Sequence, residues 1–280
     1  MLWGGAGWAP TDFECSIVPS RLPSLRAFRM LLCAGVAAVA LAACATSPET
    51  TGSIGRTDLS NMSATDTATA LGQLAARYKA NPRDKGTILY YAAALRAAGQ
   101  PEQSVSVLEA GIAIYSNDIS IKVAYAKALS AAGRFDQALN VIDDAIDPAT
   151  PDWNALLVKG AILDQSGQND QARQAYAQAQ LTAPNEASLE ANIGLSYAMT
   201  NDLTQAEQHL RKAQTMHGAN SQIRQNLALV IGLQGRFDEA KAMFAKDLPP
   251  EQVDANMSYI RALMTQQNRW DLIKGASAQG

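Results

Sequence analysis

The sequence predicts an all-α fold, a solenoid of repeated helix pairs, on the strength of three observations. Five positions spaced 34 residues apart hold the residue types that best tolerate positive φ: Gly99, Gly133, Gly167, Asn201 and Gly235. Small residues recur in the same phase: Ala92, Ala126, Gly160, Gly194 and Ala228 before the turns, then Ser104, Ala138, Ala172, Ala206 and Ala240 after them. The string Gly-Arg-Phe-Asp-Gln-Ala that starts at Gly133 returns at Gly235 with one change. Since helices whose axes cross about 8–10 Å apart need small contact residues, each period predicts helix, tight turn, helix.

This pattern divides the central part of the chain into five units: 85–118, 119–152, 153–186, 187–220 and 221–254. It resembles the tetratricopeptide repeat, whose 34-residue unit favours small residues at its eighth and twentieth positions, glycine near its fifteenth and proline near its end. The third unit fits best, with Gly160, Gly167, Ala172 and Pro184 all in phase. The resemblance implies a right-handed superhelical solenoid. Unrelated amphipathic helices of an ordinary bundle would not keep this register over five units.

Both ends of the array are predicted to close it. Residues 66–84 place Ala70 and Leu74 in the phase of a second helix, so they predict an N-terminal capping half-repeat. After the double proline Pro249-Pro250, apolar residues between positions 252 and 266 predict a covering helix. We therefore assign residues 255–280 to a C-terminal capping helix and tail.

The N-terminal segment predicts export. An uncharged apolar stretch over residues 30–43 follows three arginines and ends at Cys44, so residues 1–43 are interpreted as a signal peptide. The sequence Leu-Ala-Ala-Cys around this cysteine resembles the bacterial lipobox, which implies acylation of Cys44, for example by palmitate, and a lipid anchor. An uncleaved signal anchor is the alternative. Acidic residues and prolines in the first 20–29 positions suggest a start codon assigned too early.

The anchor leads into a predicted tether and a predicted location. Residues 44–65, with the lipidated cysteine at their head, are rich in Ser, Thr, Gly and Ala and predict a flexible linker. By the bacterial sorting rule, alanine rather than aspartate at position 45 favours the outer membrane over the inner membrane. We therefore expect a solenoid tethered to the outer membrane and facing the periplasm.

The composition favours a non-enzymatic protein. Without residues 1–43 the chain has 20 Lys and Arg against 24 Asp and Glu, a net charge of −4, which argues against nucleic acid as a partner. His209 and His217 have no cysteine or carboxylate at metal-ligand spacing, and we interpret them as ordinary helix residues. No phosphate-binding loop or nucleophile motif is present. We expect no enzyme activity, catalytic residue, metal, cofactor or small-molecule substrate.

A binding surface is predicted on the concave side, which the first helices of such a solenoid line. In proteins of this repeat type the sixth position of each unit points there, and it is occupied here by Tyr90, Ala124, Val158, Asn192 and Asn226. A carboxamide can bond the C=O and N–H of a peptide backbone together. We therefore hypothesise a peptide-binding groove formed by Tyr90, Asn192, Leu195, Gln225 and Asn226; tolerated polar residues are the alternative.

The C-terminal units carry a narrower resemblance. Residues 226–240, then Asp-Leu-Pro-Pro-Glu at 247–251 and Ala-Asn-Met-Ser-Tyr-Ile-Arg at 255–261, are similar to the closing segment of the TadD family, lipoproteins of the Flp (tight-adherence) pilus machinery. The resemblance implies a role in pilus assembly through protein partners, with the outer-membrane secretin as the expected one. A lipid-anchored adaptor of another envelope machine, such as outer-membrane protein insertion or cell-wall synthesis, is the alternative, and an enzyme is a third class without candidate residues.

Overall fold

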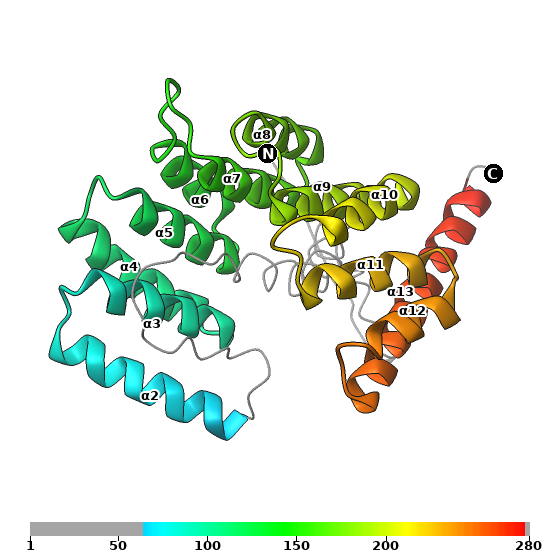
Figure 1. Cartoon of the computed structure of the whole chain (residues 1–280), viewed down its shortest axis with the longest axis horizontal. Coiled ribbons are helices and arrows are strands. Elements are labelled where there is room, and N and C mark those ends of the chain that lie inside the picture. The colour runs from blue at the N-terminus through cyan, green and yellow to red at the C-terminus, as the bar shows by residue number, and fades with distance from the viewer. Residues whose placement is uncertain (1–63, 278–280) are drawn as a thin grey trace, which may run out of the picture.

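The computed structural model describes residues 64–277, whose regular elements are all α-helices (Figure 1). A single helix, α2 (Ala64–Ala80), precedes five helix pairs, and a long helix, α13 (Pro250–Ser277), follows them. The pairs are α3 (Lys85–Ala97) with α4 (Pro101–Ile114), α5 (Ile119–Ala131) with α6 (Phe135–Asp143), α7 (Trp153–Gln165) with α8 (Asn169–Thr182), α9 (Ala187–Met199) with α10 (Leu203–Thr215), and α11 (Ser221–Leu233) with α12 (Phe237–Phe244). The all-α fold is as predicted from the sequence.

The turn inside each pair adopts the backbone conformation that its residue type predicts. All five turn positions have positive φ, from 63° at Asn201 to 85° at Gly235. Asn201 is the one residue other than glycine with positive φ in the described chain, and asparagine tolerates this conformation better than most residues. The 34-residue spacing of these turns therefore corresponds to one helix pair in each repeat.

The first helix of most pairs begins at a side-chain cap. The residue before α3, α5, α7 and α11 accepts a hydrogen bond from a backbone N–H in the first helical turn: Asp84 from Thr87 at 2.6 Å, Asp118 from Ile121 at 3.1 Å, Asp152 from Ala155 at 2.8 Å and Asn220 from Ile223 at 3.0 Å. Glu186 holds the same place before α9 but makes no such bond, because glutamate is one methylene too long to be a good cap.

The small residues lie where the helices of a pair cross. All ten of them are buried. At Gly160 an added Cβ would lie 2.3 Å from Cε1 of Tyr176, and at Gly194 it would lie 2.9 Å from Cγ of Leu210 and 3.0 Å from the carbonyl oxygen of Ala206. Only glycine fits at these two positions, and the pairs that contain them, α7–α8 and α9–α10, pack most extensively.

The pairs stack so that the first helices form a continuous layer. Helix α3 contacts α5, α5 contacts α7, α7 contacts α9, and α9 contacts α11. Figure 1 shows the pairs following one another along an open arch, with these helices toward its inner side. The core runs through the arch as three buried apolar clusters, formed by α3–α7, by α7–α9 and by α9–α13.

The last helix differs from its predicted extent. Helix α13 begins at Pro250 rather than near residue 252 or 255, and it extends to Ser277. Proline is well suited to a first helical turn, because the N–H that it lacks would have no partner inside the helix. Val253, Met257 and Ile260 of α13 are buried, and the helix contacts both α11 and α12.

The predicted signal peptide, Cys44 and most of the predicted tether lie outside the described residues. Within residues 64–277, no helix is both long enough and apolar enough to cross a bilayer.

Candidate functional site

The two predicted groove asparagines occupy the same repeat position on neighbouring first helices. Asn192 lies on α9 and Asn226 on α11, and these helices contact each other. Their side chains are more enclosed than an open groove would make them, with 4% of Asn192 and 0% of Asn226 exposed. The structure thus places both amides in the inner layer, within a largely dry environment where each hydrogen bond matters more.

Asn226 has an unsatisfied donor. Its Oδ1 accepts a hydrogen bond from Nε2 of Gln222 at 3.2 Å, but its Nδ2 is buried and has no hydrogen-bond partner. It is the one such side-chain atom among the described residues. Leaving a buried donor unpaired costs about 1–3 kcal/mol, and because this side chain is fully enclosed, an acceptor from outside the fold reaches the amide only if the covering side chains move.

The other predicted groove residues are less uniform. Nδ2 of Asn192 donates to the carbonyl oxygen of Ser188 at 2.7 Å, one turn earlier on the same helix. Leu195 is buried and Gln225 is half-buried, whereas Tyr90 is 48% exposed and lies on α3, three units away from α9. The structure therefore places Asn192 and Leu195 on α9 and places Gln225 and Asn226 on the neighbouring first helix, α11. Tyr90 lies apart from them.

A buried carboxylate joins the third unit to the fourth. Asp164 near the end of α7 is 4% exposed. Its oxygens accept hydrogen bonds from the hydroxyl of Ser196 on α9 at 2.8 Å, from the hydroxyl of Tyr176 on α8 at 2.9 Å and from Nδ2 of Asn169 at 2.8 Å. Burial raises the pKa of Asp164, and these hydrogen bonds with the nearby charge of Arg173 oppose that rise without cancelling it.

A second buried carboxylate lies on α9 itself. Glu190 is 1% exposed and contacts Nδ1 of His209 at 2.7 Å, Nζ of Lys212 at 2.9 Å and Nε2 of Gln180 at 3.1 Å. The ring of His209 also stacks on Tyr197, with the centroids 5.3 Å apart. Every contact of Glu190 is therefore with a neighbouring helix, which makes it a structural tie between α8, α9 and α10.

Sequence reasoning missed both carboxylates. Asp164 directly follows the apolar run Ala161-Ile162-Leu163, and Glu190 lies between Leu189 and Ala191 on a first helix. An acidic residue in such a stretch signals a buried ion or hydrogen-bond partner, but the sequence does not say which residue from another unit supplies the partner.

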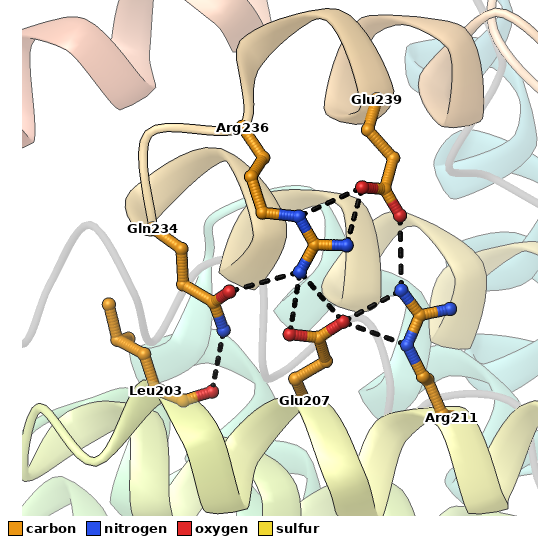
Figure 2. A network of polar contacts seen from close by, with 6 residues as sticks. All are labelled: Leu203, Glu207, Arg211, Gln234, Arg236 and Glu239. Atoms are coloured by element: carbon orange, nitrogen blue, oxygen red, sulfur yellow. Dashed lines mark hydrogen bonds and ion pairs between the residues drawn. The ribbon is translucent and has the colours of Figure 1, made fainter.

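A third polar network fixes the fourth unit against the fifth (Figure 2). The guanidinium of Arg236, in the turn before α12, donates to both oxygens of Glu207 on α10 at 2.8 and 2.9 Å and also bonds Glu239. Arg211 bridges the same two carboxylates, and Gln234 donates to the carbonyl oxygen of Leu203 at 2.9 Å. Burial opposes ionisation of Glu207, but the hydrogen bonds from Arg236 and Arg211 outweigh it and lower the pKa. This network links α10 to the turn between α11 and α12 and to the start of α12.

The described residues contain no group of three or more His, Cys, Asp and Glu side chains arranged to hold a metal ion. His217 is exposed just beyond α10.

Comparison with known proteins identifies the class to which this fold belongs. Residues 95–159 and residues 162–222 each match a sequence model of the tetratricopeptide repeat. The protein is an all-α solenoid of tetratricopeptide repeats. No curated protein sequence matches it significantly.

Solved structures agree on the fold. The chain is similar to a thermophilic tetratricopeptide-repeat protein of Thermus thermophilus, TTC0263, with a TM-score of 0.56 and 20% identity over 64% of this chain and 100% of that one. It is also similar to PilW, a type IV pilus biogenesis factor, with a TM-score of 0.53 and 12% identity over 85% of this chain and 99% of that one. Cut9–Hcn1 of the APC/C gives a TM-score of 0.54 and 14% identity, over 71% of this chain and 41% of that one.

Proposed function

We propose that this protein is a non-enzymatic scaffold that binds an extended segment of a partner protein along the inner layer of its last two units. The observation that supports it is the buried Nδ2 of Asn226, a donor that has no partner within the described fold. A main-chain carbonyl oxygen of a bound segment would satisfy that donor once the side chains that cover Asn226 move aside. The neighbouring side chains Leu195, Gln225 and Asn192 would then contact the segment's side chains and backbone.

We further propose that the partner belongs to the Flp (Tad) pilus machinery, with the outer-membrane secretin as the first candidate. The similarity to the TadD family over residues 226–261 supports this assignment, since it includes the double proline at which α13 begins. The likeness to PilW is one of fold, and it agrees with the use of such solenoids in pilus biogenesis.

The lipid anchor belongs to the same proposal. Acylation of Cys44 would hold the solenoid at the outer membrane, facing the periplasm, with residues 44–65 as the tether. Incorporation of labelled palmitate by the wild-type chain and not by Cys44→Ser would support the anchor, and equal labelling of the two would refute it.

The binding surface is tested by substituting both groove asparagines. We expect Asn192→Ala with Asn226→Ala to weaken capture of the host's secretin subunit by at least tenfold, because two buried amides lose their bonds to the bound backbone. The matched control is Gln174→Ala with Gln178→Ala, which removes two exposed amides from α8. Unchanged capture by the asparagine variant would contradict the groove.

The pilus role is tested in the host. Deletion of the gene should abolish surface pili and shift the secretin from the assembled ring to monomers, seen by imaging and by fractionation. Normal pili with a normally assembled secretin would refute the pilus assignment. That result would favour an adaptor of another envelope machine, whereas neighbouring genes for pilin, secretin and a secretion ATPase would support the pilus.

A further inference from the structure

The charge of the chain is unevenly distributed. Residues 64–97, which contain α2 and α3, hold five Lys and Arg against two Asp and Glu, whereas residues 98–280 hold fourteen against twenty. The first end of the arch therefore carries a net charge of +3, and the remainder carries −6. Such an asymmetry gives the molecule a preferred orientation in the field of a charged surface.

Three of these cations lie at the C-terminal end of α2 and in the turn that follows it, and we call them the basic rim: Arg77, Lys79 and Arg83. Arg77 and Lys79 lie in the last turn of α2, and Arg83 lies in the turn that leads to α3. All three are exposed, and none forms an ion pair with a carboxylate of the described chain. Lys85, two residues further on, differs from them because it pairs with Asp118 at 2.8 Å.

The rim lies at one end of the helices rather than in a groove. The hydroxyl of Tyr115, just after α4, donates to the carbonyl oxygen of Arg83 at 2.6 Å, and the Lys85–Asp118 pair brings the start of α5 to the same edge. Ile119, the first residue of α5, is 46% exposed there. The edge thus carries three exposed cations and an exposed aliphatic side chain, together with the carboxylates of Asp84 and Asp118.

We propose that the basic rim is a membrane-contact surface that binds anionic phospholipid headgroups. Free cations next to an exposed aliphatic side chain suit the boundary between charged headgroups and acyl chains. The rim lies at the end of α2 opposite to Ala64, about 25 Å along the helix, and a tether of residues 44–65 with a root-mean-square reach of about 25 Å would let it reach the same membrane. The acidic remainder of the chain is repelled by the same surface, so the arch stands away from the bilayer with its later units toward the periplasm. This surface is separate from the groove and does not require it.

Vesicle binding tests the proposal directly. The buried residues of the three core clusters all lie between Ile88 and Ile260, and the residues packed against them lie between Leu71 and Met264. A chain that starts at Ala45 therefore keeps the whole core and carries no lipid. We expect it to sediment with vesicles of phosphatidylglycerol and phosphatidylcholine and to bind less as the salt concentration rises. It should not sediment with vesicles of pure phosphatidylcholine.

The variant Arg77→Gln, Lys79→Gln, Arg83→Gln should reduce partitioning onto the anionic vesicles about a hundredfold, since each cation near such a surface contributes about fivefold. The matched control, Lys241→Gln, Lys246→Gln, Arg261→Gln, changes the net charge equally at exposed positions of the last units and should keep binding within about threefold of the wild type. Circular dichroism confirms that both variants fold.

Three results would overturn the proposal: no binding of the wild-type chain to the anionic vesicles, equal losses in the two variants, or vesicle binding that survives in the rim variant. If the rim variant keeps its vesicle binding but no longer binds immobilised polyglutamate, the rim is a surface for an acidic protein instead. Secretin capture by the rim variant, which should equal that of the wild type, separates this test from that of the groove.

Discussion

The first and third units meet the same packing requirement with different side chains. In the first unit, Ala92 lies against Ser104, whose buried hydroxyl donates to the carbonyl oxygen of Ala92 at 2.8 Å. In the third unit the position of Ala92 is Gly160, because the ring of Tyr176 takes the space that a Cβ would fill. The hydroxyl of that ring in turn needs a buried acceptor, which Asp164 supplies. Tyr176 thus has a glycine opposite its ring and a buried carboxylate as the acceptor for its hydroxyl.

Among the substitutions that test this comparison, Gly160→Ala should have the largest effect on stability. The new Cβ would lie 2.3–2.7 Å from three ring atoms of Tyr176, so we expect the free energy of unfolding to fall by about 1–3 kcal/mol through overpacking. Urea denaturation measures it. The control is Gly72→Ala on α2, where a Cβ meets nothing within 4 Å, and which should stabilise the helix by about 0.5–1 kcal/mol. Equal effects of the two substitutions would show that the glycine–tyrosine contact is not tight.

The caps of the first helices provide a second contrast between units. Asp152→Ala before α7 should cost about 1 kcal/mol of unfolding free energy, because its carboxylate accepts the N–H of Ala155. Glu186→Ala before α9 should stay within about 0.5 kcal/mol of the wild type, since Glu186 makes no cap bond. Glu186→Asp should stabilise the fourth unit. A cost at Glu186 equal to that at Asp152 would contradict this assignment, and thermal melts of the three variants decide it.

The pH dependence of stability tests the buried carboxylate of the third unit. Because burial raises the pKa of Asp164 above its ordinary 3.8, the folded protein still holds a proton that the unfolded chain has released between the two values. The contribution of Asp164 to stability is therefore complete below the ordinary value and declines as pH rises through the folded-state pKa. Unfolding titrations should show this decline in the wild type and not in Asp164→Asn. Parallel pH profiles of the two proteins would contradict the assignment.

We expect the smallest effect on stability at the arginine of the repeated hexapeptide, which has different ion-pair partners in the second and fifth units. Arg236 in the fifth unit bonds Glu207 and Glu239, whereas Arg134, its counterpart in the second unit, has one ion pair, with Glu102 at 3.7 Å. We expect Arg236→Ala to lower the melting temperature more than Arg134→Ala, and added salt to reduce the difference, because exposed ion pairs are screened. Equal shifts in the two variants would mean that the network in Figure 2 adds nothing to a single pair.

The repeat itself could be predicted from sequence because its rules are local or periodic. Positive φ at Gly99 or Asn201 follows from residue type, and the burial of Ala126 or Ala206 follows from spacing. The start of α13 at Pro250 was misplaced by a few residues, because a proline that ends one segment is equally able to begin the next helix.

The candidate site was predictable only in outline. The repeat position indicated Asn192 and Asn226, but their burial depends on how neighbouring units pack, and no single unit contains that information. The same holds for Asp164 and Ser196, whose hydrogen bond joins residues 32 positions apart. The free Nδ2 of Asn226 is visible only when every neighbour has been placed.

Helix α13 bears on whether copies of this protein can associate end to end. It contacts α11 much as α11 contacts α9, so it occupies the place that another first helix would take. A second molecule that laid its own leading helix on this side of α11 would have to displace α13. This helix therefore works against head-to-tail chaining of copies through the last unit.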